Sequence, residues 1–365
     1  MKRIVLSATN DLFCDQRIDK VCKSLTKNGF HVTVVGRRYN NSPILPPRDY
    51  HVKRLHLFFK KGPFFYAEFN LRLFFYLLFI KVDILVANDL DTLLPNVLVK
   101  KMRNKKLVFD AHEYFCGILE IQHRPRVKKI WQRIEKFCFP KTDVVVTVSK
   151  SIADKYQEEY GKNVSVVRNI PVLEIRENMN VTDNDKPVII LQGNAIHKDR
   201  GGEEIVEALP LINNANLLIV GQGDMIPKMK ARVTELNLQE RVAFIGTVTP
   251  EKLRTYTTSA DLGIALDKNV SLNHYYSLPN KLFEYIHAGT PVISSDLPER
   301  KRIIEQYDVG VVVPDLEPAT VANAINSILN NKEKLNQLKA NCMAATQELN
   351  WENEEKLLLK LYLTV

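Results

Sequence analysis

Cysteine is scarce in this sequence and shows no pairing pattern. The five cysteines are an odd number, and no two of them stand in C-x-x-C spacing; they are Cys14, Cys22, Cys116, Cys138 and Cys342. This excludes a disulfide framework or a zinc knuckle as the basis of the fold. We therefore expect a protein of a reducing compartment, the cytoplasm.

Long apolar runs are also missing. The apolar run at residues 4–8 is too short for the core of a signal peptide, and we expect a first strand there. Residues 64–80 (FFYAEFNLRLFFYLLFI) are interrupted by Glu68 and Arg72, which makes them a poor membrane span. Two interpretations of this segment stay open: a helix buried on a sheet, or a helix that lies in the membrane interface behind two lysines.

The sequence has no basic repeat with interleaved aromatic residues, the pattern that tracks single-stranded nucleic acid. Its formal net charge of +9 nevertheless favours anionic partners. Phosphates on a small ligand or on lipid head groups fit this charge better than nucleic acid. We therefore expect no nucleic-acid partner, and we predict contact with an anionic membrane through residues 53–81, at the inner face of the plasma membrane.

Internal repeats and low-complexity tracts are absent, and the chain alternates strand-like apolar runs with helical patterns. Continuous Val/Ile/Leu strands followed by helices predict an α/β protein with parallel sheets covered on both faces. The predicted strands are 4–8, 32–36, 84–88, 107–110, 144–148, 188–192, 217–220, 242–245, 262–265, 292–294 and 310–313.

The length of 365 residues suits two domains. A polar, turn-rich stretch within residues 169–187 predicts a linker between domains at 1–170 and 186–345. An amphipathic helix at 350–365 is expected to pack back on the first domain. Ligands of open parallel sheets bind outside the carboxyl ends of the strands, so the residues there are the candidates for chemistry.

One candidate lies after the first strand of the second domain. Gly201 and Gly202 open a helical pattern, and the N–H groups of a helix N-terminus attract phosphate. Arg200, just before them, can add a bidentate contact. A plain strand-to-helix turn explains the same residues. The G-x-G at Gly221 is a weaker signal, because the dinucleotide fingerprint needs a third glycine where Ile226 stands.

The most informative stretch is SLPNKLFEYIHAGTPVISSD, at residues 277–296. Pro279 precedes a predicted helix that ends at Gly289, as expected for helix boundaries. Lys281 and Glu284 are three residues apart and share one face of it. A cation at this end suits a diphosphate, and a carboxylate one turn later suits two ribose hydroxyls. The alternative is an ordinary, weak surface ion pair.

This stretch resembles the donor-nucleotide motif of the retaining family 4 glycosyltransferases, which have the GT-B fold. Further segments agree in order: VVVTVSKSIADKYQEEYG with VRNIP, LQGN with RGGEEIVEAL, LLIVGQGD, and RVAFIGTVTPEKLRTYTTSADLGIAL. The resemblance covers most of the chain, most densely residues 143–315. It implies two facing Rossmann-like domains with an interdomain cleft, the first binding the acceptor and the second the nucleotide-sugar donor.

The resemblance also implies roles for single residues. Glu284 binds the ribose, Arg200 and Lys281 bind the diphosphate, and the turn at Gly246 recognises the base. Further residues belong to the matching donor segments: Gly193, Asn194, Gly221, Pro279, Asn280 and Leu282. The chain departs from the family at Tyr276, where many members have a glutamate that holds the sugar, and at Asn194, where many have arginine.

The first domain gives a thinner signal. Its strand 107–110 is followed by His112 and Glu113, and the family places a histidine here beside the reacting carbon of the donor sugar. A zinc-protease motif would need histidine where Cys116 stands. The D-x-D at 89–91 suits a metal, but we favour Asp91 as a helix N-cap.

The first loop, 10–17, is expected to border the cleft, with Asp15 and Arg17 on the acceptor side. The function that follows is a retaining, metal-independent sugar transfer from a UDP- or GDP-type donor to a saccharide or lipid-linked saccharide, in surface polysaccharide synthesis. No further cofactor is expected. Two alternatives stay open: a nucleotide-sugar-binding protein that has lost catalysis, and an epimerase or phosphorylase of the same architecture.

Overall fold

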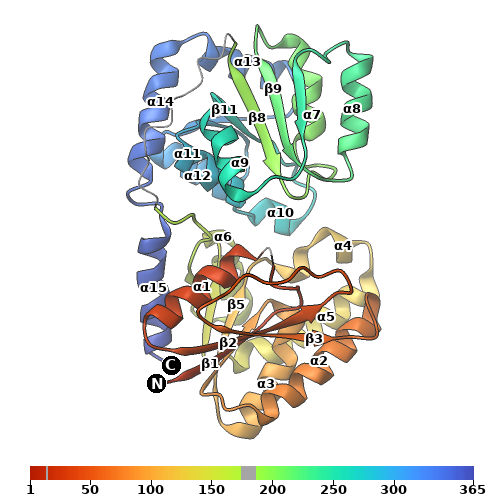
Figure 1. Cartoon of the computed structure of the whole chain (residues 1–365), viewed down its shortest axis with the longest axis vertical. Coiled ribbons are helices and arrows are strands. Elements are labelled where there is room, and N and C mark those ends of the chain that lie inside the picture. The colour runs from red at the N-terminus through yellow and green to blue at the C-terminus, as the bar shows by residue number, and fades with distance from the viewer. Residues whose placement is uncertain (14, 174–185) are drawn as a thin grey trace. The chain divides into compact units, whose positions relative to one another are not determined.

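The computed structural model describes residues 1–13, 15–173 and 186–365. Cys14 and most of the predicted linker, at 174–185, lie outside these residues. The chain forms two compact units (Figure 1). Unit 1 comprises Met1–Asn169 and Glu354–Val365, and unit 2 comprises Ile170–Asn353.

Unit 1 is built on a parallel sheet of seven strands in the order β3-β2-β1-β4-β5-β6-β7. Because β1 pairs with both β2 and β4, the strand order reverses at β1 and β4, which is where ligands bind in such sheets. The strands are β1 (Arg3–Ser7), β2 (His31–Arg38), β3 (His51–His56), β4 (Ile84–Asn88), β5 (Lys106–Ala111), β6 (Val144–Thr147) and β7 (Ser165–Val166).

The helices of unit 1 connect these strands, as parallel pairing requires. They are α1 (Gln16–Lys27), α2 (Gly62–Phe79), α3 (Leu93–Arg103), α4 (Leu119–Gln122), α5 (Pro125–Cys138) and α6 (Lys150–Tyr160). The last helix, α15 (Trp351–Leu363), belongs to unit 1 from Glu354 onward. There Glu354 accepts hydrogen bonds from the backbone and side chain of Arg168 at 2.7 Å.

Helix α2 corresponds to the segment for which the sequence left two interpretations open. One face is buried and consists of Phe65, Phe69, Leu73 and Leu77. The opposite face is exposed and equally apolar, and it consists of Phe64, Ala67, Leu71, Phe75 and Phe79. The buried face confirms the first interpretation, and contact of the exposed face with a membrane stays a prediction. No helix in the described parts of the chain is long and apolar enough to cross a membrane.

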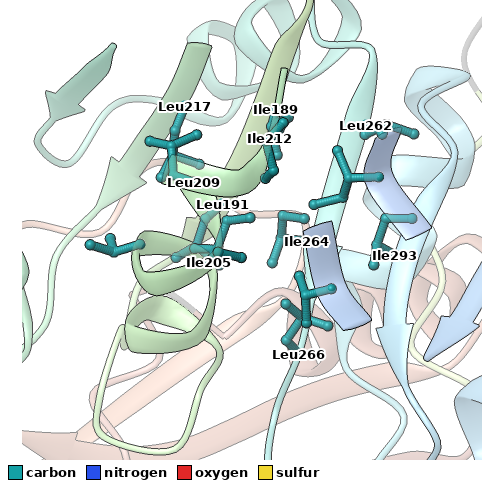
Figure 2. Packing of buried hydrophobic residues seen from close by; sticks show 14 of the residues in the cluster. Ile189, Leu191, Ile205, Leu209, Ile212, Leu217, Leu262, Ile264, Leu266 and Ile293 are labelled. Carbon is teal, nitrogen blue, oxygen red and sulfur yellow. The ribbon is translucent and has the colours of Figure 1, made fainter. Parts of the chain in front are cut away.

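Unit 2 is built on a parallel sheet of six strands in the order β10-β9-β8-β11-β12-β13. Its strand order reverses at β8 and β11. Figure 2 shows the core on one face of this sheet, where Ile189, Leu217 and Ile264 pack with Ile205, which lies in the first helix of unit 2. The strands are β8 (Val188–Gly193), β9 (Asn216–Gly221), β10 (Val242–Ile245), β11 (Leu262–Ala265), β12 (Val292–Ser295) and β13 (Gly310–Val313).

Helices again join consecutive strands in unit 2, and two further helices follow its last strand. They are α7 (Gly202–Ala208), α8 (Ile226–Glu235), α9 (Pro250–Thr258), α10 (Leu272–Tyr276), α11 (Asn280–Ala288), α12 (Pro298–Tyr307), α13 (Pro318–Leu329) and α14 (Lys332–Ala345). The two parallel sheets confirm the predicted α/β class, and every predicted strand is present. Two strands, β3 and β7, were not predicted.

Candidate functional site

The candidate site of unit 2 lies at the carboxyl ends of β8 and β11, where the strand order reverses. Asp267 follows β11 closely, and its side chain is only 1% exposed. Three cations surround it: Oδ1 lies 3.2 Å from Arg200 Nη1, and Oδ2 lies 3.3 Å from Lys281 Nζ and 2.8 Å from Arg300 Nη1. Burial alone would raise the pKa of Asp267, but these charges, Arg300 foremost, lower it well below its usual range.

The three cations are held to different degrees. Arg300 is fully buried, and its guanidinium also donates to Ala265 O at 3.1 Å and to Ser277 Oγ at 3.2 Å. The side chains of Arg200 and Lys281 are 37% and 14% exposed. Arg300 therefore belongs to the interior, whereas Arg200 and Lys281 can meet a ligand.

Glu284 is fixed by the strand beside it. Its Oε2 accepts a hydrogen bond from Gln192 Nε2 at 2.6 Å, and Gln192 Oε1 accepts one from Thr257 Oγ at 2.7 Å. Gln192 is buried near the end of β8. These two successive hydrogen bonds, from Thr257 to Gln192 and from Gln192 to Glu284, set the orientation of the Glu284 carboxylate. The sequence predicted Glu284 but not the two residues that hold it.

Helix α11 carries Lys281 and Glu284 into this site. Pro279 stands at its N-cap position and has no side-chain cap to offer, and Asn280 after it is exposed. Leu282 was predicted to contact the donor, but its side chain is fully buried in the core. We therefore reassign Leu282 to packing, because a leucine in that environment cannot face a ligand.

The predicted glycines differ in what they do. Gly221 has a φ of +126°, and a Cβ there would lie 1.9 Å from the carbonyl oxygen of Gly193. Gly221 thus allows the ends of β8 and β9 to approach closely, which is a packing role, whereas a Cβ at Gly193 would meet only ordinary contacts, at 3.6 Å or more. Gly246 is exposed, and a Cβ at that position would have no atom within 4 Å. Asn194 is exposed as well.

The candidate site of unit 1 lies at the ends of β4 and β5. His112 sits between two carboxylates, with Nδ1 3.6 Å from Asp89 Oδ2 and Nε2 3.5 Å from Asp110 Oδ2. Asp89 Oδ1 also accepts the backbone N–H of His112 at 2.8 Å. Burial alone would lower the pKa of His112, but Asp89 and Asp110 outweigh it and raise that pKa to about 9. The two carboxylates therefore favour the protonated imidazole.

Arg17 was predicted to face the acceptor, but the structure places it inside unit 1. Its side chain is 3% exposed, and all three of its nitrogens are used: two bind the Asp110 carboxylate, at 2.7 and 3.3 Å, and one binds Val167 O at 2.7 Å. We therefore reassign Arg17 to a structural role, which is to hold the Asp110 carboxylate in place. Asp15, beside it, caps helix α1 by accepting from the N–H of Ile18 at 2.9 Å. Glu113 is half-buried.

The prediction of Asp91 as a helix N-cap is wrong. Asp91 lies in a short 3-10 helix before α3, and its Oδ2 accepts from Thr9 Oγ at 2.6 Å instead. The neighbouring Asp89 has a φ of +62° and ψ of 166°, a backbone region that only glycine adopts readily. Across the described residues, no group of three or more His, Cys, Asp and Glu side chains is arranged to hold a metal ion.

The sequence profile of the family "Glycosyl transferases group 1" matches residues 174–343, and that of "Glycosyltransferase Family 4" matches residues 16–170. The chain belongs to the group 1 glycosyltransferases. Among its relatives are a phosphatidyl-myo-inositol mannosyltransferase from Mycobacterium leprae and a chitobiosyldiphosphodolichol beta-mannosyltransferase from Candida albicans. The first is 28% identical over 46% of this chain and 43% of its own length, the second 22% identical over 65% and 57%. The chain thus spans about half the length of these relatives.

Solved structures resemble this chain over its whole length. A sucrose-phosphate synthase from Thermosynechococcus elongatus has a TM-score of 0.80 at 20% identity, covering 100% of this chain and 99% of its own. HepE from Anabaena, in complex with UDP, has a TM-score of 0.77 at 14% identity and covers 100% of both chains. These similarities confirm the GT-B fold class.

Besides Gln192 and Thr257, sequence reasoning missed three charged residues: Asp267, Asp89 and Arg300. Asp267 carried a usable signal, since it is a carboxylate that follows an apolar strand. Asp89 carried the same signal but was considered only as part of the D-x-D. Arg300 carried none, because it lies in helix α12 and reaches Asp267 only through the fold.

Proposed function

We propose that this protein transfers a sugar from a nucleoside-diphosphate donor to an acceptor hydroxyl, with the nucleotide bound by unit 2 and the acceptor by unit 1. The observation that supports it most is the pairing of Arg200 and Lys281 around Asp267, with Glu284 one turn further along α11. The cations suit a diphosphate, and the carboxylate suits the adjoining ribose hydroxyls.

In the proposed reaction, the bond between the anomeric carbon and the diphosphate breaks, and the diphosphate leaves with the bonding electrons. Arg200 and Lys281 stabilise the negative charge that develops on it, which is the role a metal ion has in other transferases. The first turn of α11 adds its positive end. The acceptor oxygen then bonds to the anomeric carbon and loses its proton.

We further propose that the anomeric configuration is retained. Attack and departure then occur on the same face of the sugar, and the departing diphosphate oxygen is placed to take the acceptor's proton. No protein nucleophile is needed. His112, which lies between two carboxylates, and Glu113 beside it are the candidates that unit 1 offers for this reaction.

The donor is proposed to be of the UDP or GDP type, used as co-substrate without a further cofactor. HepE, which shares the fold, has been solved with UDP and with UDP-glucose. Two relatives are named for lipid acceptors, phosphatidyl-myo-inositol and chitobiosyldiphosphodolichol. This supports a saccharide or lipid-linked saccharide as the acceptor here. We further propose that the reaction belongs to surface polysaccharide synthesis, on the cytoplasmic side of the plasma membrane.

Thermal unfolding with single nucleotides tests the donor site. We expect one of UDP, GDP, ADP and CMP to stabilise the protein in the presence of EDTA, by about 2.7 kcal/mol at one hundred times its Kd. Glu284→Ala should abolish this stabilisation. Lys281→Ala should lower both donor affinity and turnover, and unchanged values would refute its assignment.

A protein that binds the donor without transferring it is the second candidate, and two departures from the family favour it. Tyr276 replaces the glutamate that commonly holds the sugar, and Asn194 replaces an arginine. Tight nucleotide binding with no turnover of any donor, with or without acceptors, would assign this role instead. Conversion of the donor sugar in the absence of an acceptor would indicate an epimerase.

The exposed face of α2 is proposed to contact an anionic membrane. Phe64, Leu71, Phe75 and Phe79 are between 50% and 79% exposed on one side of this helix. Exposed lysines flank both of its ends, at positions 60, 61 and 81. An apolar face with positive charge at both ends of the helix suits a helix that lies among anionic head groups.

Flotation with liposomes tests this contact. The protein should float with vesicles that contain phosphatidylglycerol and not with purely zwitterionic ones. The double change Phe75→Ser and Phe79→Ser should abolish flotation, whereas Leu211→Ser, at an equally exposed leucine in unit 2, should not. A concentration-dependent dimer that the same double change removes would assign this face to self-association instead.

A further inference from the structure

The carboxylate of Asp267 is the only anion we find within the group of cations formed by Arg200, Lys281 and Arg300 in the described part of unit 2. Three positive charges and one negative charge leave an excess of two positive charges in this group. All three contacts to Asp267 are between 2.8 and 3.3 Å, so the four groups act on one another at close range.

Lys281 is the one cation of this group that can lose its charge by deprotonation. An arginine keeps its proton at any working pH, whereas a lysine shifts its pKa readily when it is buried. Burial lowers the pKa of Lys281, Asp267 opposes that change, and Arg300 and Arg200 add to it. Glu284 is on the same helix but is bound to Gln192. Asp267 is therefore the charge that favours the protonated ammonium.

The same carboxylate fixes geometry. A guanidinium has five N–H groups, and Arg200 gives one of its nitrogens to Asp267, which orients the planar group without consuming it. The ammonium group of Lys281 likewise has three N–H bonds, and it lies 3.3 Å from Asp267 Oδ2. Both side chains thus keep donors for a ligand.

We propose that Asp267 is the positioning residue of the donor site, holding Lys281 charged and Arg200 aligned for the diphosphate. This inference rests on the proposed function for the identity of the ligand. Asp267 itself makes no contact with the diphosphate, because its side chain is buried and negative. It acts through the two cations, and Arg300 anchors it from the interior.

The titration of Lys281 tests the inference without any substrate. Lysine Cε chemical shifts, followed by NMR on ¹³C-labelled protein, report the pKa, and Lys281→Arg identifies the signal. In Asp267→Asn the pKa of Lys281 should fall by about one to three units, as expected for loss of an opposite charge at this distance. An unchanged pKa would overturn the proposal.

Arg300→Met gives the converse test and serves if Asp267→Asn does not fold. It removes one cation and keeps Asp267, so the pKa of Lys281 should rise. The control is Asp261→Asn, which removes a carboxylate that binds Lys339 at 2.8 Å and the N–H of Val188 at 2.9 Å in the same unit. That change should leave the titration of Lys281 unmoved. An equal shift in the control would mean that any disturbance of unit 2 has this effect, and it would overturn the proposal.

Nucleotide binding then connects Asp267 to function. With the nucleoside diphosphate that stabilises the native protein, Asp267→Asn should lose affinity as pH rises through the lowered pKa of Lys281, by about tenfold per pH unit. A loss that is equal at every pH would contradict the role assigned here. If the native protein binds no nucleoside diphosphate, the proposed function fails, while the titration of Lys281 still decides whether Asp267 controls its charge.

Discussion

Replacing Glu284 by glutamine offers the sharpest test of how the donor's ribose is held. Glu284 Oε2 accepts the Gln192 amide at 2.6 Å, and a glutamine can keep that bond through its carbonyl oxygen. The substitution therefore removes charge and one acceptor while it preserves the orientation of the side chain. A hydrogen bond to a charged group contributes about 1.5–3 kcal/mol to binding, so the affinity of the Glu284→Gln variant for the nucleotide should fall about 10- to 150-fold.

Removing one ribose hydroxyl from the nucleotide is the change in the ligand that matches the change in Glu284. If UDP binds, calorimetry with UDP and 2′-deoxy-UDP on the native protein and on Glu284→Gln completes a double-mutant cycle. The missing hydroxyl should weaken binding to the native protein and have little effect on the variant. If the deoxy compound loses the same factor against both proteins, Glu284 does not bind that hydroxyl. The same cycle with 3′-deoxy-UDP shows which hydroxyl is involved.

Three further predictions concern the groups that support the sites. Arg17→Met should destabilise unit 1 by about 3–5 kcal/mol, because it leaves a buried carboxylate with one partner fewer; denaturant unfolding and hydrogen exchange of the β5 peptides measure this. The folded-state pKa of His112 is raised to about 9 from 6.5, so its contribution to stability is complete below pH 6.5 and is lost as pH rises through 9. Unfolding of His112→Asn should lack that part of the pH dependence. Gly221→Ala should prevent folding because its Cβ would meet the Gly193 carbonyl, whereas Gly246→Ala should leave the melting temperature of the protein unchanged. A comparable loss of stability in both variants would contradict the packing role of Gly221.

Much of the fold was predictable because both sheets are parallel and buried. Strands such as β4 and β11 are continuous apolar runs, and a run of that kind predicts a strand without any knowledge of its neighbours. β3 escaped prediction because its sequence, HVKRLH, is polar and its residues are exposed or half-buried at the edge of the sheet. β7 has only two residues, which is too short for any pattern.

The candidate sites were predictable where one helix carries two functional residues. Lys281 and Glu284 follow from the boundaries of α11 and a spacing of three. Polar side chains that meet across the fold leave no such pattern: Arg300 contacts Asp267 over a separation of 33 positions, and Thr9 contacts Asp91 over 82. This is also why Asp91 was mistaken for a cap, since a local role was the only one its neighbours could suggest.

Helix α2 raises a question of orientation, because either of its apolar faces would gain by being buried. Its few polar residues decide the matter. Asn70 donates to the backbone oxygen of Asp91 at 2.9 Å, and Glu68 accepts the N–H groups of Phe58 and Phe59 at 2.9 to 3.0 Å. Rolling the helix to bury the other face would break both sets of bonds and gain no apolar contact in return. Two polar side chains therefore determine which aromatic residues this protein shows to its surroundings.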